Sequence, residues 1–226
     1  MNDLQDILAS LSQYSIGLPF IIGSIFFGRL IREQRMVWFF VIVSLFFEVA
    51  ADYRVGFIEW VFGVPGNNLP GLHLFTIAQY VMILVIYGRF LRQFIPNTVF
   101  WAILIAFPIW GIMSATFIDG WYNYNPHARA VQIISILILI LCYFYQLLKN
   151  VEINRLESDP LFWVSCGLLI YFSGSLFIFL MSNYFLANKN YELLDSIYGM
   201  HSILNIIANL AYTIALWINS RKPISP

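Results

Sequence analysis

The 226-residue sequence predicts an all-α, polytopic membrane protein with seven transmembrane helices. Composition is the first observation, because 60% of the residues are hydrophobic and 11% are charged, against about 45–50% and about 25% in soluble domains. The second is that seven apolar runs are each long enough to cross a bilayer core of about 30 Å, which takes about 20 helical residues. The third is that charged residues, prolines and asparagines gather in the short connections between these runs.

In chain order, the predicted membrane-spanning helices cover residues 14–32, 36–53, 72–91, 98–118, 128–149, 160–186 and 197–219. The segment Met1–Gln13 contains two acidic residues and no basic one, so we expect no cleaved signal peptide. Asp159 and Pro160 suit the start of the sixth helix, where proline is tolerated in the first turn. The two longest connections, Tyr53–Gly71 and Ile118–His127, are too short to fold alone, so we predict one domain over residues 1–226.

Lysine and arginine side chains predict the orientation, because the cytoplasmic ends of membrane helices carry an excess of them. With the N-terminus outside, the outer side holds Arg54, Arg129 and Lys189. The cytoplasmic side then holds nine, namely Arg29, Arg32, Arg35, Arg89, Arg92, Lys149, Arg155, Arg221 and Lys222. The opposite orientation inverts this ratio, so we predict the N-terminus outside and the C-terminus in the cytoplasm.

Several classes of protein are excluded. Twelve basic and twelve acidic residues give no net charge, which argues against nucleic-acid binding. The seventh predicted helix has no lysine, so retinal cannot be bound there as a Schiff base. Cys142 and Cys166 are too few for a disulfide framework and are interpreted as small buried apolar residues. No phosphate loop, nucleophile elbow or dinucleotide fingerprint is present, and we predict no cofactor.

A weak internal repeat relates the first three helices to the last three. The third helix begins with Gly-Leu-His73 and the seventh with Gly-Met-His201, while Val37-Trp38-Phe39 in the second corresponds to Phe162-Trp163-Val164 in the sixth. The fourth helix would then be a linker that restores the parallel orientation, as in sugar transporters of the SWEET type. The sequence therefore raises a 3+1+3 arrangement as a hypothesis.

Polar side chains lie on single faces of several predicted helices, near their outer ends. Ser44, Glu48 and Asp52 follow one another at intervals of four residues. His73, Thr76, Tyr80 and Tyr87 form a second stripe, and His201 belongs to the longest one. If the faces converge, they form a polar cavity that opens outward. The candidate ligand-binding residues are Glu48, Asp52, His73, Tyr80, Gln132, Tyr198, His201, Asn205 and Asn209.

Three interpretations of this cluster remain open. The polar stripes can be interhelical hydrogen bonds that hold the bundle together, at about 0.6 kcal/mol per contact. They can also line a pocket for a small amphiphile or a lipid headgroup, with polar groups over an apolar floor. In the third interpretation, His73, His201, Glu48 and Asp52 bind zinc, and a zinc-bound water hydrolyses a lipid amide or ester. No His-Glu-x-x-His spacing supports that third interpretation.

Several short segments resemble a family of small, uncharacterised seven-helix membrane proteins of the Bacteroidota. These segments are Asn67-Asn68-Leu69, Leu72-His73-Leu74-Phe75, Tyr145-Gln146-Leu147-Leu148, Asp159-Pro160-Leu161-Phe162-Trp163, Tyr171-Phe172-Ser173-Gly174-Ser175-Leu176-Phe177 and His201-Ser202-Ile203-Leu204-Asn205-Ile206. The resemblance spans the second to seventh helices. It implies an inner membrane of a two-membrane bacterium, a pocket facing the periplasm and an association with sensor histidine kinases, but it implies no activity.

The favoured hypothesis is a sensory or receptor-like membrane protein without enzymatic activity, which binds a small ligand from outside. Its connections are too short to hold an output domain, so it needs a partner: a sensor kinase or another membrane signalling subunit. The first alternative is a small-solute transporter with 3+1+3 helices, although the polar stripes fade below Tyr87 and Tyr212. The second is the zinc-dependent membrane hydrolase. All three hypotheses place the protein in a lipid bilayer.

Overall fold

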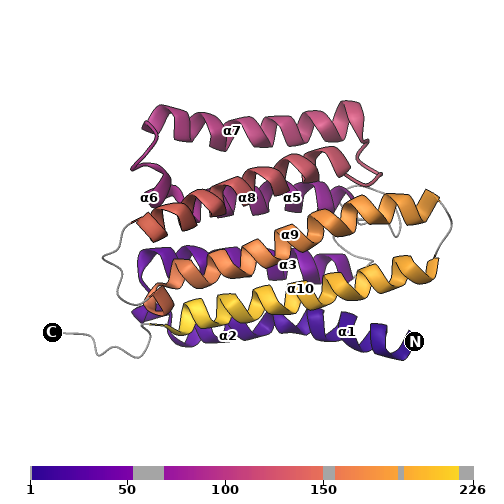
Figure 1. Cartoon of the computed structure of the whole chain (residues 1–226), viewed down its shortest axis with the longest axis horizontal. Coiled ribbons are helices and arrows are strands. Elements are labelled where there is room, and N and C mark those ends of the chain that lie inside the picture. Colours follow the sequence, from indigo (N-terminus) through magenta and orange to yellow (C-terminus); the bar gives the residue numbers. More distant parts are fainter. Residues whose placement is uncertain (1, 53–68, 150–155, 188–190, 219–226) are drawn as a thin grey trace. The chain divides into compact units, whose positions relative to one another are not determined.

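The computed structural model describes residues 2–52, 69–149, 156–187 and 191–218, and every regular element in this part of the chain is a helix (Figure 1). Side chains are described in these ranges except at residues 2–4, 51, 52, 179–187, 191–195 and 198. The helices are α1 (Asn2–Ser15), α2 (Gly17–Ile25), α3 (Arg32–Asp52), α5 (Leu69–Ile86), α6 (Gly88–Leu91), α7 (Asn97–Met113), α8 (Pro126–Lys149), α9 (Pro160–Ala187) and α10 (Tyr191–Trp217). Short turns of 3-10 helix lie at Phe27–Arg29 (η1) and Leu156–Ser158 (η3), and a π-helical turn, η2, covers Ser114–Ile118.

Six helical segments are long and apolar enough to cross a membrane. They are Gln5–Ile25, Leu69–Ile86, Asn97–Ile118, Pro126–Lys149, Pro160–Ile178 and Gly199–Trp217. Five of them correspond to the predicted runs at residues 72–91, 98–118, 128–149, 160–186 and 197–219. The prediction of a polytopic, multi-pass membrane protein of the all-α class is thereby confirmed for the described residues.

The first span lies earlier in the chain than residues 14–32, where the sequence predicts it. The apolar residues of α1 extend the helical segment back to Gln5, and Ser12 and Ser15 are buried in it. The segment ends at Ile25, because the chain passes through the 3-10 turn η1 and Leu30 then adopts extended backbone angles. The predicted start at residue 14 is wrong, because the apolar helical segment reaches back to Gln5.

The predicted second span, residues 36–53, coincides with helix α3, which is 21 residues long. This helix is not among the six apolar segments. It carries charged residues at both ends, with Glu33 and Arg35 in its first turns and Glu48 one turn before its last residues. The described chain therefore has six spans without α3 and seven if α3 also crosses the membrane.

The described chain divides into two compact units, one with residues 1–41 and 137–226 and one with residues 42–136. Helices α3 and α8 each begin in one unit and end in the other. Because the first unit joins the first helix with the last two, the units do not follow the two triplets of the proposed repeat. The repeat and the single domain over residues 1–226 both stay predictions.

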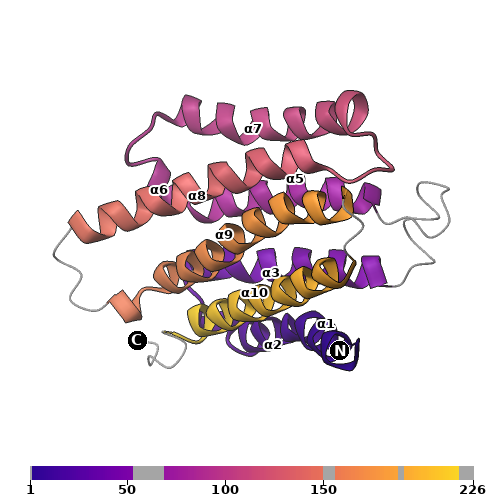
Figure 2. The ribbon, with the colours of Figure 1, turned by 45° about the vertical axis from the view of Figure 1, so that its right-hand side comes forward.

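In the first unit, α10 packs along α9, α1 and α2, and both views show α9 and α10 side by side (Figures 1 and 2). Helices α9 and α10 approach closely at Gly167. A Cβ on this glycine would lie 2.8 Å from the Cβ of Ala211 and 3.3 Å from the carbonyl oxygen of Ala208. Small residues at such crossings allow membrane helices to pack backbone to backbone.

Pairs of contacts give the directions of the helices in the first unit. Ser12 and Ser15 of α1 pair with Asn205 and Asn209 of α10, so α1 and α10 run parallel. Gln34, near the start of α3, is fully buried and donates from Nε2 to the carbonyl oxygens of Ala215 and Ile218, each at 2.7 Å.

The first part of α3 runs the other way. Phe40, further along α3, packs edge-on against Tyr212, nearer the start of α10. Gln34 contacts the last residues of α10 and Phe40 an earlier one, so α3 runs antiparallel to α10. Consecutive long helices of this unit therefore reverse direction between α1 and α3, as membrane-crossing helices with a short connection do.

In the second unit, α5 packs against α7 in antiparallel fashion. The rings of Tyr80 and Phe107 stack with centroids 3.9 Å apart. Gly111, one turn beyond Phe107, faces Ile77, whose Cγ1 would lie 2.8 Å from a Cβ on the glycine. Helix α5 is also the most buried of the six apolar segments. These contacts place α5 in the interior of the unit.

Both cysteines are free thiols in the first unit. Cys142 is exposed on α8 and Cys166 is half-buried on α9. The prediction that both are buried is wrong for Cys142, because the apolar run of α8 covers the whole helix and the buried face cannot be read from the sequence there.

Candidate ligand-binding site

Helix α5 presents a face of buried polar side chains over its first three turns. His73, Thr76 and Gln79 follow one another at intervals of three residues, and Tyr80 lies beside them. All four are buried, and Thr76 has no exposed surface. The predicted stripe of this helix included His73, Thr76 and Tyr80 but passed over Gln79. Because α5 is interior to its unit, these groups must find hydrogen-bond partners within the protein.

Helix α8 supplies partners through Arg129 and Gln132, which are three residues apart on one face. Arg129 donates from Nη1 to Oε1 of Gln79 at 3.0 Å and to Oε1 of Gln132 at 3.1 Å. Gln132 donates from Nε2 to the carbonyl oxygen of Thr76 and to Oε1 of Gln79, each at 3.0 Å. We call Thr76, Gln79, Arg129 and Gln132 the Arg129 network. It joins the first turns of α5 and α8, so these two helices begin at the same end of the unit.

Arg129 is 4% exposed, although the sequence-based topology treated it as a surface cation. A charged residue in a membrane helix costs about 2.5–3.5 kcal/mol at the helix centre on insertion scales, and less near the helix ends. Its place in the first turn of α8 adds an unfavourable interaction with the helix dipole, which favours anions at that end. Hydrogen bonds to charged groups, worth about 1.5–3 kcal/mol, offset part of this cost. Arg129 is therefore held in its position at an energetic cost.

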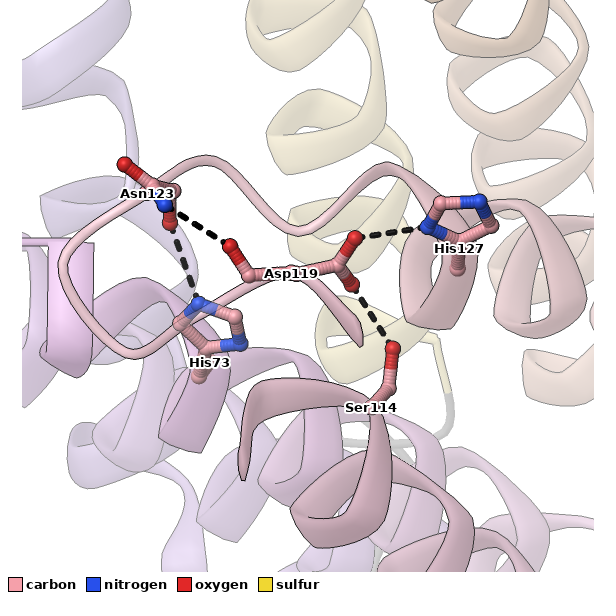
Figure 3. A network of polar contacts seen from close by, with 5 residues as sticks. All are labelled: His73, Ser114, Asp119, Asn123 and His127. Atoms are coloured by element: carbon pink, nitrogen blue, oxygen red, sulfur yellow. Dashed lines mark hydrogen bonds and ion pairs between the residues drawn. The ribbon is translucent and has the colours of Figure 1, made fainter. Parts of the chain in front are cut away.

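The connection between α7 and α8 folds over the start of α5 (Figure 3). Ser114 donates its hydroxyl to Oδ2 of Asp119 at 2.7 Å, and Nδ1 of His127 lies 2.6 Å from Oδ1 of the same carboxylate. The backbone carbonyl of Asp119 accepts from Nδ2 of Asn123 at 2.9 Å. Nε2 of His73 lies 3.1 Å from the carbonyl oxygen of Asn123. These contacts tie the connection to both helices and to α5.

The conformation of this connection depends on two local features. The π-helical turn closes with a bond from the backbone N–H of Asp119 to the carbonyl of Ser114, which brings their side chains together. Gly120 has φ of +81°, a left-handed conformation that glycine adopts without steric cost. The carboxylate of Asp119 is 3% exposed, whereas the ring of His127 is 60% exposed and covers it from outside.

Asn125 joins the connection to the Arg129 network. It is fully buried and donates from Nδ2 to the hydroxyl of Thr76 at 2.8 Å, and its carbonyl accepts from the backbone N–H of Arg129 at 3.1 Å. Asn125 therefore links the connection to Gln132 through Thr76, whereas His127, Asp119, Asn123 and His73 form a second set of contacts.

A separate set of polar contacts lies in the first unit. Asn205 donates to the hydroxyl of Ser12 at 3.0 Å and Asn209 to that of Ser15 at 2.7 Å, both between α10 and α1. His201 lies edge-on to Tyr171 of α9, with Nε2 3.4 Å from the phenol oxygen. The two asparagines make the kind of contact that the interhelical hydrogen-bond interpretation predicts for them.

The nine predicted site residues therefore fall into several groups. Gln132 belongs to the Arg129 network, and His73 binds the α7–α8 connection in the same unit. Tyr80 lies one turn beyond Thr76 on α5, bonded to the side chain of Ser135. His201, Asn205 and Asn209 belong to the other unit. Glu48 is half-buried on α3, and the side chains of Asp52 and Tyr198 lie outside the described residues. A ligand-binding role for these residues stays a prediction.

The sequence analysis missed several members of the set. Gln79 and Arg129 were passed over, and so were Ser114, Asp119 and Asn125 near the α7–α8 connection. The spacing of Arg129 and Gln132 on a helix beginning at Pro126 could have indicated a shared face. The partners across helices could not be found in this way, because periodicity identifies a face and not what it meets.

A metal site is the third interpretation of the predicted cluster. Among the described side chains, no three His, Cys, Asp or Glu residues come together as ligands for a metal ion. His73 and His201, two of the four proposed zinc ligands, each contact other protein groups in their own unit.

Comparison with known proteins gives no match to a family model, to a curated protein or to a solved structure. What the chain can do must therefore be inferred from its own residues. The membrane-spanning helices and the buried polar set around Arg129 are the features that bear on function.

Proposed function

We propose that this chain is a receptor-like membrane protein that binds a small polar ligand at the Arg129 network and passes the change to a partner. The observation that carries the proposal is Arg129 itself. An ionisable side chain buried in a membrane helix is expensive and marks a functional site by default. Gln79 and Gln132 each offer Arg129 an uncharged acceptor, which a ligand can replace.

Two features of the network suit signalling. It joins α5, α8 and the α7–α8 connection, so a ligand that changes its hydrogen bonds acts on all three. Helix α8, which is 24 residues long, then continues to Lys149. Near its far end, Tyr143 donates to the carboxylate of Asp159 at 2.7 Å, next to the start of α9. A movement at the start of α8 would alter the hydrogen bond between Tyr143 and Asp159.

We also propose that α3 is a seventh span, with the N-terminus outside and the C-terminus in the cytoplasm. The parallel course of α1 and α10 supports this, because the first and last spans run in the same direction only when their total number is odd. The nine cytoplasmic and three outer cations support the orientation. In this topology the Arg129 network lies near the outer side.

The proposed location is the inner membrane of a bacterium of the Bacteroidota, with the network facing the periplasm. A sensor kinase or another membrane signalling subunit is the proposed partner, since the connections of this chain leave no room for an output domain. Both parts of the proposal rest on the resemblance described above and on the length of the connections.

The binding part can be tested with the full chain in lipid nanodiscs. Thermal unfolding, followed by tryptophan fluorescence, would be recorded with a panel of small amines, polyols, sugars, amino acids and carboxylic acids. A ligand at 100 times its Kd stabilises the folded state by about 2.7 kcal/mol, which raises the Tm by several degrees. We expect one class to do so, and Arg129→Gln to lose the shift while Arg89→Gln, at an exposed arginine of α6, keeps it.

Two results would contradict the proposal. One is a panel in which no compound changes the Tm, and the other is an equal shift in Arg129→Gln and the unchanged protein. The signalling part is tested by crosslinking in native membranes, where the active compound should change the yield of a crosslinked kinase or other signalling subunit. Accumulation of that compound inside proteoliposomes would indicate a transporter instead.

A further inference from the structure

Two buried hydrogen-bond acceptors, one near the start of α5 and one in the α7–α8 connection, have no donor among the described residues. They are Nδ1 of His73 and Oδ1 of Asn125. His73 is 2% exposed and Asn125 has no exposed surface. A buried polar atom without a partner is rare in native proteins, so each one calls for a physical reason.

The bonding of the neighbours identifies both atoms as acceptors. Nε2 of His73 faces the carbonyl oxygen of Asn123, which can only accept, so Nε2 carries the hydrogen and Nδ1 of the neutral ring is an acceptor. The hydroxyl of Thr76 donates to the carbonyl of Leu72, so it can only accept from Asn125. The amide of Asn125 must therefore present Nδ2 to Thr76, which leaves Oδ1 as the second acceptor.

The two acceptors belong to one small region of the unit. His73 and Thr76 lie one turn apart on the same face of α5, and Asn123 and Asn125 bind them from the same connection. Figure 3 draws a contact at only one ring nitrogen of His73, the nitrogen that faces Asn123. The indole of Trp121 lies against the imidazole, with ring centroids 5.6 Å apart. This region needs hydrogen-bond donors, and an aromatic surface lies next to it.

We propose that this region binds a small molecule or headgroup through O–H or N–H donors, with a hydroxyl or a primary ammonium directed at His73 and Asn125. The inference rests on the proposed function, whose site it extends from the Arg129 network to the start of α5. The inference restricts the ligand to those compounds of the thermal unfolding test that carry O–H or N–H groups. Amines and polyols fit, and so do the ethanolamine and glycerol headgroups of lipids.

The test uses the full chain in phosphatidylcholine nanodiscs, because the choline headgroup offers no such donor. Ethanolamine and glycerol are the soluble probes, and phosphatidylethanolamine or phosphatidylglycerol mixed into the disc is the lipid probe. The readouts are the ¹⁵N resonance of His73 Nδ1, which moves upfield when this nitrogen accepts a hydrogen bond, and the Kd from titration. We expect one of the probes to move the resonance and His73→Phe to weaken its binding roughly ten-fold.

His127→Gln is the matched control, because His127 is exposed and its ring contacts Asp119 and not this region. We expect this variant to bind the probe as the unchanged protein does. A response to the soluble probes identifies a free ligand, and a response to the lipid probes alone identifies a headgroup. The NMR measurement on the unchanged protein keeps the test valid if His73→Phe fails to fold.

The inference is overturned if none of the probes moves the Nδ1 resonance, or if that nitrogen already shows a hydrogen-bonded shift in phosphatidylcholine discs that no probe changes. The second result would mean that ordered water satisfies the acceptor. The proposed function is tested separately, by the effect of Arg129→Gln on the shift in Tm. If a compound without O–H or N–H donors raises the Tm and Arg129→Gln removes the effect, the receptor proposal stands and the donor ligand is excluded.

Discussion

Two kinds of buried polar residue occur in these membrane helices, and they differ in charge and in their hydrogen-bond partners. Asn205 and Asn209 each donate to a serine of α1 and are neutral, so they suit a role in holding helices together. Arg129 is charged, buried and placed at a helix end where its charge is unfavourable. A helix–helix contact does not need a guanidinium, since amides and hydroxyls provide it at lower cost. The cost of burying Arg129 supports the ligand-binding role that we propose for it.

Replacing Gln79 by leucine should destabilise the protein measurably. Oε1 of Gln79 accepts from both Arg129 and Gln132, so Gln79→Leu deprives two buried donors of an acceptor. The expected loss is about 2–3 kcal/mol in the free energy of unfolding, because one of the donors is charged. Unfolding in mixed micelles, followed by tryptophan fluorescence, measures it.

Gln93→Leu is the control for this change, because Gln93 is exposed. Adding Arg129→Met to Gln79→Leu should recover part of the loss, since the double variant no longer buries a charge short of an acceptor. If Gln79→Leu and Gln93→Leu are equally stable, the Arg129 network does not contribute as described.

Among the elements, the pair α9 and α10 depends on glycines and the α7–α8 connection on side-chain hydrogen bonds. Gly167 lies against Ala211 and the backbone of Ala208, so little can move to accept a larger residue. Gly174 of the same helix faces the methyl ends of Leu204, which can rotate away. The connection, in contrast, is built around the buried carboxylate of Asp119. Close helix packing and a connection held by side-chain hydrogen bonds are thus found in different parts of the chain.

Gly167→Ala should lower the stability of the α9–α10 pair. The added methyl group would lie 2.8 Å from the Cβ of Ala211, and overpacking of this kind costs about 1–3 kcal/mol. Gly17→Ala is the matched control, because a Cβ on Gly17 meets no atom within 4 Å and alanine favours the helix α2. The Tm in nanodiscs should fall for the first variant and stay or rise for the second. Equal Tm values would mean that α9 and α10 are further apart than described.

For the molecule as a whole, the direction of the helices decides the topology. Six apolar segments alone would place both termini on the same side of the membrane. The parallel pairing of α1 with α10 favours the odd number of crossings that we propose. In this proposal, helix α3, which is antiparallel to α10 and 21 residues long, provides the additional crossing.

Reporter fusions distinguish six spans from seven. A fluorescent protein fused after the C-terminus should fold and fluoresce in the cytoplasm, and an alkaline phosphatase fused there should be inactive. An epitope at the N-terminus should be reached by antibody from the outer side of intact spheroplasts. Termini found on the same side would exclude α3 as a span and with it the proposed orientation.

The composition and the lengths of the apolar runs were sufficient to predict an all-α, multi-pass membrane protein and five of its spans, because bilayer thickness and backbone hydrogen bonding leave helices few alternatives. Helical periodicity also identified the face that contains His73 and Thr76. Other features required the tertiary structure. The sequence cannot show that Gln79 and Arg129 meet, that Cys142 is exposed or that α1 begins so early, because each depends on which neighbouring helix covers a given face. Burial of Arg129 is the clearest case, since a lysine or arginine near a helix end is normally counted as a surface charge, and only its partners across α5 show otherwise.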